Sequence, residues 1–393
     1  MNEKFEQVRR FFPHTNKIVF FNTAAFSPMS TPIKEAIDAN FDIRMAAEID
    51  DTRQMYELRE RVREGYAELI GAETRQVGVS INTSFGLDLA SYGLPLKEGD
   101  EILLSDIEFP ATIYAWRGAA ETRKLKISYI KSKERKFDIP ALENAITERS
   151  RVLSISFVQF FNGFKNDLKR LSEICQKHNL FFVVDGIQGA GAEPINVAEL
   201  DIDIFSAGCQ KWLLAPFGSG FYYISDKVKD QLTSHNITWY SSNWEFQFSD
   251  LFKYNLPYFD TAEKFQGGYY ATLNLLGMEA SQKIILDLGI DNIQRHNHRL
   301  IDIIVETLKE SDYYKITSSL KPGERSSILT IACDKLTELH RYLFSQKIYV
   351  ACREGSVRIA VHLFNNESDV EKLLEALKKF EKSNSRNLAG KTN

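Results

Sequence analysis

The sequence predicts an α/β fold in which a larger domain holds a mainly parallel seven-stranded sheet and a smaller α+β domain follows it. Between about residues 76 and 225, seven short apolar or β-branched runs alternate with helical patterns. After residue 271 a long helical region is followed by strand-like and helical segments in a two-layer pattern. Regular alternation of this kind indicates a doubly wound sheet with helices on both faces.

The seven strands of the larger sheet are predicted from runs of five to eight residues. They are residues 76–81, 101–105, 126–130, 151–158, 180–185, 202–206 and 220–224. The clearest helix between them covers 168–178, where Leu168, Leu171, Ile174 and Cys175 recur at three- and four-residue spacing. In such sheets, ligands bind beyond the carboxyl ends of the strands, so the polar residues that follow each strand are the candidates for a site.

The predicted domains are a large domain over 20–270 and a small domain over 271–382, with residues 1–19 packing against the small one. Within the large domain, 226–270 is aromatic and polar without a clean period, which indicates irregular structure near a site or an interface. The small domain is expected to hold a helical region over 273–308, strands at 327–332, 348–352 and 357–362, and helices at 335–345 and 367–382. The polar residues 383–393 are expected to be a disordered tail.

Composition places the chain among soluble globular proteins, with 44% hydrophobic and 26% charged residues. A net charge of −4 gives no reason to expect nucleic acid or a membrane surface as partner. The N-terminus lacks an apolar signal region, and no apolar run approaches the ~20 residues of a spanning helix, so a cytoplasmic protein is expected. The four cysteines and seven histidines have no metal-ligand spacing, and no metal is expected.

Two charged residues in the second half of the predicted sheet suggest the chemistry. Asp185 ends the apolar run 180–184, and Lys211 follows it by 26 positions, after a further strand. Either charge would be costly to bury alone. Both are needed by pyridoxal phosphate, since a lysine amine forms a Schiff base with the aldehyde and a carboxylate keeps the pyridine nitrogen protonated.

Several segments along nearly the whole chain, in order and spacing, resemble the class V aminotransferase family of fold-type I pyridoxal phosphate enzymes. Its members include cysteine desulfurases, selenocysteine lyases and isopenicillin N epimerase-like proteins. The segments are Phe21-Asn-Thr-Ala-Ala-Phe-Ser-Pro28, Asn82-Thr83-Ser84-Phe85-Gly86, Glu108-Phe109-Pro110, Asp185-Gly-Ile-Gln188, Gln210-Lys211-Trp212 and Val357-Arg358-Ile-Ala-Val-His362.

The resemblance implies a role for each matching residue. Lys211 would form the Schiff base and act as base at the substrate Cα, while Asp185 would contact the pyridine nitrogen and Gln188 the ring oxygen. Phe109 would stack on the ring. The residues implied in cofactor-phosphate binding are Thr83, Ser84, Gln210 and, replacing a partner-chain Thr, Tyr269. The substrate would be bound by Arg358, through its carboxylate, and by Asn22. The relatives also imply a homodimer.

The reaction expected is transamination of an amino acid or related primary amine. Epimerisation at Cα and C–S or C–Se lyase chemistry are the alternatives, because all three begin with deprotonation at the same carbon. Sulfur transfer through a persulfide is disfavoured, since Cys352 precedes Arg358 by only six positions. A nucleotide-dependent oxidoreductase is disfavoured because Gly186, Gly189 and Gly191 do not form GxGxxG. A non-enzymatic protein that has kept only the fold is a further alternative.

Overall fold

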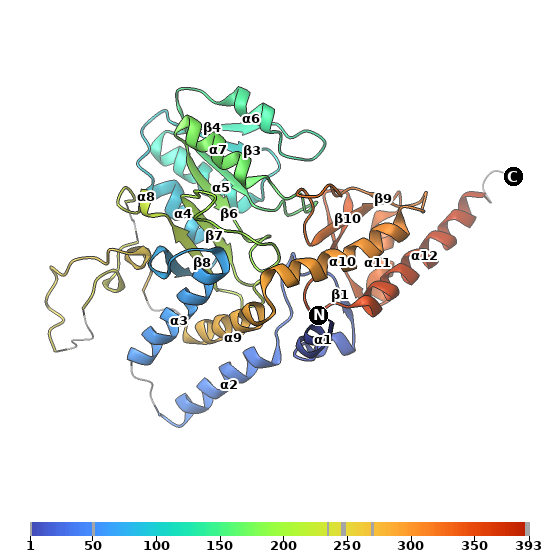
Figure 1. Ribbon diagram of the computed structural model, residues 1–393, viewed down its shortest axis with the longest axis horizontal. Coiled ribbons are helices and arrows are strands. Elements are labelled where there is room, and N and C mark those ends of the chain that lie inside the picture. Colours follow the sequence, from blue (N-terminus) through green and yellow to red (C-terminus); the bar gives the residue numbers. More distant parts are fainter. Residues whose placement is uncertain (1, 49–51, 234–235, 245–248, 269–270, 390–393) are drawn as a thin grey trace.

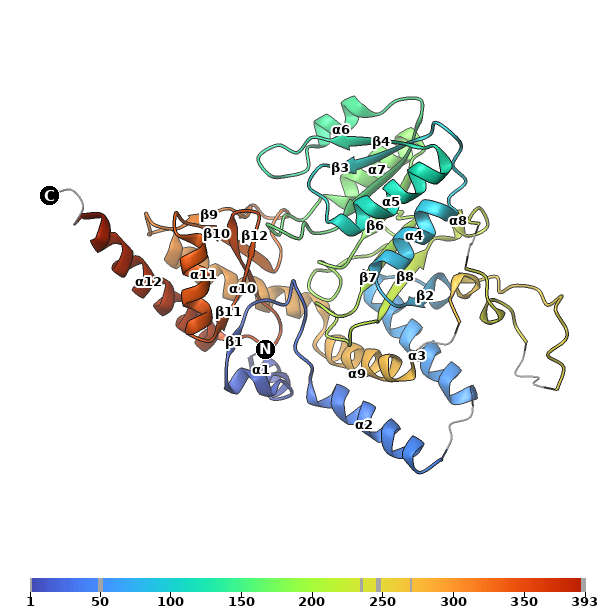
Figure 2. The ribbon, with the colours of Figure 1, turned by 180° about the vertical axis from the view of Figure 1, so that it is seen from behind.

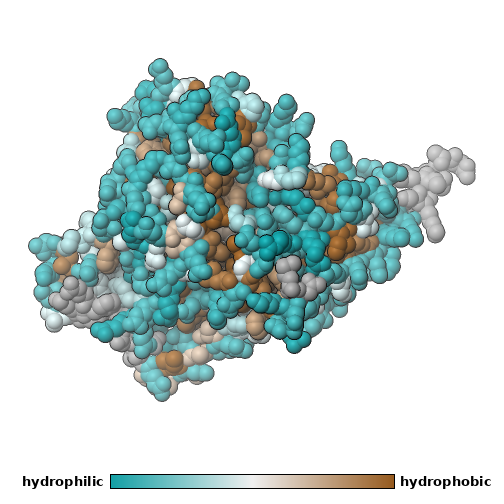
Figure 3. Space-filling view, viewed as in Figure 1, coloured by the Kyte–Doolittle hydropathy of each residue, from teal (hydrophilic) through white to brown (hydrophobic). Residues whose placement is uncertain are grey.

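A computed structural model describes residues 2–48, 52–233, 236–244, 249–268 and 271–389. It consists of a large part built on one sheet and a smaller part built on a second sheet, lying side by side (Figures 1 and 2). Most of the face seen in Figure 3 is hydrophilic, and its apolar residues show mainly in a central band.

The large sheet has seven strands in the order β2-β8-β7-β6-β5-β3-β4. Within this sheet β8 runs opposite to the other six described strands, which are parallel to one another, so the predicted mainly parallel sheet is confirmed. The strands are β2 (Val77–Ser80), β3 (Glu101–Ser105), β4 (Lys126–Ile130), β5 (Ser150–Ser156), β6 (Phe181–Asp185), β7 (Ile204–Gly208) and β8 (Gly220–Ile224). All seven overlap the runs from which they were predicted.

Alternate residues of the central strands feed two separate cores. Ile102 and Leu104 of β3 pack with helices α4 (Thr83–Gly93) and α5 (Pro110–Arg123). Leu103 between them packs in the core that holds α3 (Thr52–Ile70) and α7 (Leu168–His178). A strand buried on both faces shows no polar alternation, which explains the continuous apolar runs. Helices therefore cover both faces of the sheet (Figures 1 and 2).

The second sheet has the order β12-β13-β10-β9 and is antiparallel. Its strands are β9 (Lys315–Ile316), β10 (Ile328–Ala332), β12 (Ala351–Arg353) and β13 (Ser356–Ala360). One face packs on α10 (Ile290–Leu308), α11 (Leu336–Ser345) and α12 (Glu367–Ala389), which supply much of a separate apolar core.

The N-terminal residues contact the second sheet and the helices around it. β1 (Val19–Phe20) pairs in parallel with β11 (Ile348–Tyr349), and Arg9 forms an ion pair of 2.7 Å with Asp369. The domain boundaries 20–270 and 271–382 stay predictions.

The other helices are α1 (Asn2–Arg9), α2 (Thr31–Met45), α6 (Ile139–Ala145), α8 (Asp226–Lys229), α9 (Thr272–Leu288), and the short 3-10 helices η1 (Pro13–Asn16), η2 (Thr74–Gln76), η3 (Trp239–Ser241) and η4 (Ala262–Phe265).

Three elements differ from the prediction. The helical region 273–308 is two helices, because Gly289 adopts a φ of +79° between α9 and α10. The run 348–352 is two strands, since β11 pairs with β1 and β12 with β13. The last helix, α12, extends to Ala389, so residues 383–389 are helical rather than part of a disordered tail. No Gly or Pro that would end this helix occurs before Gly390.

No helix in the described ranges is long and apolar enough to cross a membrane.

Candidate active site

Strand topology brings the predicted site residues to one edge of the large sheet. β2, β3, β6 and β7 all point the same way, so the residues that follow them meet at their carboxyl ends. One cavity of about 330 Å³ lies there, against the second sheet. Eight predicted site residues line it: Thr83, Ser84, Phe109, Asp185, Gln188, Gln210, Lys211 and Arg358.

The Lys211 side chain is only 8% exposed, in the loop directly after β7. Burial lowers the pKa of its amine to about 8, an effect that nearby Asp185 opposes and Arg358 and Arg353 reinforce. Its Nζ lies 5.5 Å from the centre of the Phe109 ring. About a tenth of the amine is therefore uncharged at pH 7, far more than for an ordinary lysine, and a nucleophile or a base needs this uncharged form.

Asp185 ends β6 and is 2% exposed. Its Oδ1 accepts a hydrogen bond of 3.0 Å from the backbone N–H of Ile187, and its Oδ2 one of 3.4 Å from the Thr112 hydroxyl. Burial raises the pKa of this carboxyl, while the Ile187 N–H, Lys211 and Thr112 lower it. Sequence reasoning did not single out Thr112, because it sits inside α5 with no pattern that distinguishes it from other helix residues.

The start of α4 forms another end of the cavity. Unlike the end with Lys211 and Asp185, it contributes uncharged side chains. Asn82 caps the helix by accepting from the Phe85 N–H at 3.0 Å, which leaves the first N–H groups available for an anion. The Thr83 Oγ1 accepts from the Gly208 N–H at 2.8 Å and keeps its own hydroxyl proton to donate. A Cβ at Gly208 would lie 2.5 Å from the Gln210 Oε1. The Gln210 side chain therefore occupies the space that a side chain at position 208 would need.

Gln188 is held in one orientation by two neighbours. Its Oε1 accepts from the indole N–H of Trp212 at 2.9 Å, and its Nε2 donates to the Ala24 carbonyl at 3.0 Å. Since an indole can only donate, the amide oxygen must face Trp212. The backbone carbonyl of Trp212 in turn accepts from the His362 Nε2 at 2.9 Å, which fixes the residue beside Lys211.

Glu108 is a buried group of this region to which the sequence assigned no role. Its Oε1 accepts from the Ser156 N–H at 3.2 Å and from the Gln159 Nε2 at 2.8 Å, and its Oε2 from the Ser156 hydroxyl. Burial raises the pKa of this carboxyl to about 7. Because Ser156 pairs with Asp185 across β5 and β6, Glu108 ties the Phe109 loop to the strand beside the cavity.

Arg358 lies in β13 with its side chain on the cavity face, while Val357 and Ile359 pack in the second core, as their alternation predicted. It is 2% exposed, its Nη1 donates to the Phe160 carbonyl, and its Nε has no hydrogen-bond partner. Burial lowers the pKa of this guanidinium to about 9. A buried, unpaired cation of this kind suits a carboxylate ligand.

Two predicted residues are not among those lining the cavity. Asn22 forms a bridge to Ala360, beside the arginine strand, and its neighbours Ala24 and Ala25 line the cavity instead. Tyr269 lies outside the described residues. Arg353, to which the sequence assigned no firm role, does line the cavity.

None of the four cysteines lines this cavity. Burial raises the pKa of all four thiols, to about 12 for Cys209. Cys352 points to the second core, away from Arg358. No cluster of three metal-ligating side chains occurs in the part of the chain that the structure describes.

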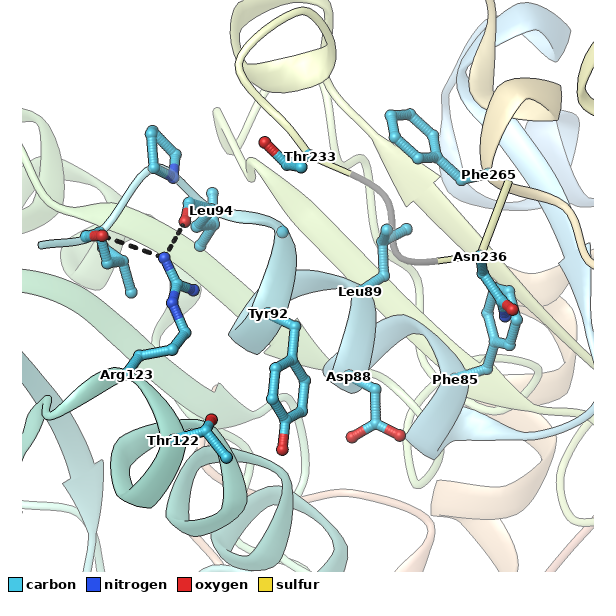
Figure 4. A pocket seen from close by; sticks show the side chains of 13 residues that line it. Phe85, Asp88, Leu89, Tyr92, Leu94, Thr122, Arg123, Thr233, Asn236 and Phe265 are labelled. Atoms are coloured by element: carbon cyan, nitrogen blue, oxygen red, sulfur yellow. Dashed lines mark hydrogen bonds between the residues drawn. The ribbon is translucent and has the colours of Figure 1, made fainter. Parts of the chain in front are cut away.

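A larger cavity of about 910 Å³ lies elsewhere, along α4 and α5 (Figure 4). Phe85, Leu89 and Phe265 line it with Asp88 and Tyr92. The Arg123 guanidinium donates to the carbonyls of Ser91, Leu94 and Leu96. None of the predicted site residues lines this cavity, and its larger volume does not make it the candidate site.

The family pattern described as aminotransferase class-V matches residues 38–373. The chain belongs to the class-V aminotransferase family. It is 23% identical to a Bacillus subtilis protein described as the uncharacterized aminotransferase YcbU, over 95% of this chain and 97% of that protein. It is 26% identical to a probable cysteine desulfurase of Borreliella burgdorferi, over 96% of each chain.

Among solved structures, the cystine C–S lyase C-DES shares the fold, with a TM-score of 0.86 and 20% identity over 93% of this chain and 98% of that one. A mutant of C-DES has also been determined with glycine covalently linked to the pyridoxal phosphate cofactor. The predicted family, fold class and pyridoxal phosphate-dependent enzyme class are therefore confirmed.

The residues present fit the cofactor of this family. Lys211 and Asp185, both buried, face one cavity, and the N-terminus of α4 lies at the same cavity with its first N–H groups not used by the Asn82 cap. Lys211 would hold the cofactor aldehyde, Asp185 the pyridine nitrogen, and the α4 N-terminus with Thr83, Ser84 and Gln210 the phosphate.

Proposed function

We propose that this class-V aminotransferase family member transaminates an amino acid, with Lys211 as the catalytic base. The observation that supports this most is the convergence of Lys211, Asp185 and Arg358, all buried, on a single cavity. An amine, an acid and an unpaired guanidinium supply a base, a support for a positive ring and a site for the substrate carboxylate.

Pyridoxal phosphate, when bound, withdraws electrons from the substrate Cα and makes its proton removable. Lys211 Nζ takes that proton, aided by a pKa of about 8 that leaves part of the amine neutral. Asp185 would contact the pyridine nitrogen, where a carboxylate would favour the protonated, positive ring. Arg358 would fix the α-carboxylate, and Phe109, whose ring centre lies 5.5 Å from Lys211 Nζ, would stack on the cofactor ring.

The proposal is tested by giving the cofactor-loaded protein a panel of amino acids with and without a 2-keto acid. Transamination predicts that each substrate becomes its keto acid and that the added keto acid becomes an amino acid, both identified by mass. A substrate that is recovered with inverted Cα configuration, and no keto acid, would replace transamination with epimerisation.

A C–S lyase is the second candidate. Relatives include probable cysteine desulfurases, but here all four thiols lie away from the cavity, so a persulfide on this chain has no support. Elimination from an amino acid such as cystine needs the same base and no thiol. Release of sulfide or a persulfide from cystine without any added keto acid would favour this candidate over transamination.

We also propose a homodimer. Phe252 and Tyr254, in the segment between α8 and α9, are 86% and 84% exposed in the single chain. Large exposed aromatic side chains are enriched at subunit contacts. In both ribbon views the described part of this segment extends away from the large sheet (Figures 1 and 2). Sedimentation that finds a fully active monomer would contradict the dimer.

The cytoplasmic location stays a prediction.

A further inference from the structure

The hairpin of β12 and β13 presents two arginines on one face. Its turn has two residues, Glu354 and Gly355, both at positive φ, of +44° and +77°. Such a turn keeps the strands in tight register, with Ala351 opposite Arg358 and Arg353 opposite Ser356. Arg353 and Arg358 are therefore diagonal neighbours on the same face, close enough for their long side chains to reach one ligand.

That face of the hairpin looks into the candidate active site. Both guanidiniums line the cavity with Lys211, and Cys352 and Val357, one residue along, lie on the opposite face in the second core. Arg353 is exposed at the tip, at the edge of the cavity, while Arg358 is buried deeper.

Neither arginine is neutralised by the protein. In the described ranges no ion pair joins either of them to a carboxylate. The Arg353 Nη1 donates only to its neighbour, the Cys352 carbonyl, at 2.7 Å, and Arg358 donates to the Phe160 carbonyl. Two like charges held diagonally on one face repel each other, so each gains from an anionic ligand.

Each anionic group that would bind in this cavity needs a positively charged partner or a set of N–H donors. Asp185 is the acid lining the cavity, and it faces Lys211 and the pyridine side. In the proposed function, the cofactor phosphate lies at the α4 N-terminus and the substrate α-carboxylate on Arg358. Of the basic side chains that line the cavity, Arg353 is then left without an assigned anion, at the exposed edge of the cavity.

We infer that Arg353 binds a second anionic group, on the side chain of the substrate, so that the enzyme acts on acidic amino acids. This inference rests on the proposed function and adds its substrate class. The cavity of about 330 Å³ must also accommodate the cofactor, so a short side chain of the size of aspartate or glutamate fits best. The amides asparagine and glutamine have nearly the same shape without the charge.

The experiment compares each acid with its amide on the cofactor-loaded enzyme, by spectral titration of the bound cofactor and by kcat/KM. The acids are expected to be preferred. Arg353→Gln is expected to lower the acid-over-amide ratio roughly 10- to 100-fold, the effect of losing one hydrogen-bonded charge pair. Arg353→Lys, which keeps the charge, restores part of the ratio. Arg341→Gln, an exposed arginine of α11 outside the cavity, leaves the ratio unchanged.

The outcomes separate this inference from the proposed function. Equal use of acids and amides, a ratio unaffected by Arg353→Gln, or no response to any of the four amino acids overturns the substrate class. Transamination of neutral amino acids in those cases leaves the proposed function intact. Failure of every amino acid in the panel, with no cofactor held at Lys211, would overturn the function itself.

Discussion

Two of the protein's cavities, of about 330 and 910 Å³, differ in charge in the opposite sense from their volumes. Each is lined by a phenylalanine ring with a lysine Nζ near it, at 5.5 Å for Lys211 and Phe109 and at 5.4 Å for Lys264 and Phe265, but Lys264 itself is not among the residues that line the larger cavity. The smaller cavity also gathers Asp185 and two arginines, and the larger one is mostly apolar, with Asp88 and Arg123 as its charged side chains. Buried charges that shift one another's pKa values therefore identify the candidate site better than the volume of a cavity does.

Replacing Lys211 should have the largest effect. Lys211→Ala removes both the group that holds the cofactor and the base, so kcat is expected to fall by at least about 10³-fold. Turnover of the amino acid panel checks this. The matched control is Lys264→Ala, which removes the same contact to a ring at the larger cavity and should leave kcat within about twofold.

Replacing Asp185 should have the next largest effect. Asp185→Asn keeps the shape, and its one oxygen can still accept from the Ile187 N–H while its NH2 group faces the Thr112 hydroxyl. It cannot support a positive ring, so kcat should fall roughly 100-fold or more. Steady-state kinetics on the loaded protein measure it. An unchanged kcat would mean that Asp185 serves only to end its strand.

The pH dependence of cofactor uptake should follow Lys211. Burial lowers the pKa of its amine to about 8, and only the neutral amine attacks an aldehyde. The rate at which protein freed of cofactor takes up pyridoxal phosphate should therefore rise about tenfold per pH unit below pH 8 and level off above it. Stopped-flow absorbance measures the profile, and a rise that continues to pH 10 would indicate an exposed lysine.

Replacing Asp88 should have the smallest effect. Partial desolvation raises the pKa of this exposed carboxyl, so its charge destabilises the folded state slightly at neutral pH. Asp88→Asn should leave kcat/KM within about twofold and raise Tm a little, since such changes are within about 0.5 kcal/mol. A large loss of kcat would give the larger cavity a part in catalysis and break the comparison.

The sequence predicted those parts of the site that follow from strand ends. Asp185 and Lys211 each come directly after an apolar run, and parallel strands must bring such positions to one edge. Arg358 was predictable because Val357 and Ile359 flank it with apolar residues that must face a core. Most strands of the large sheet were predictable for a related reason, since they are apolar runs buried on both faces, whereas the edge strand β4 is buried only at Ile130.

Contacts that depend on side-chain packing were not predictable. Thr112 reaches Asp185 from within a helix, and Glu108 takes its donors from two residues about fifty positions away. The break between α9 and α10 depends on the backbone of Gly289, a residue that can also continue a helix. Arg353 lies at the cavity only because the two-residue turn sets the register of β12 and β13.

The central claim is that one buried amine, on Lys211, holds the cofactor in the smaller cavity. Reduction of the loaded protein with borohydride, followed by peptide mapping by mass spectrometry, tests it most directly. We expect the cofactor to be fixed to the peptide that contains Lys211, with a stoichiometry near one per chain. Fixation to another lysine, such as Lys264, with Lys211 unmodified, would contradict it.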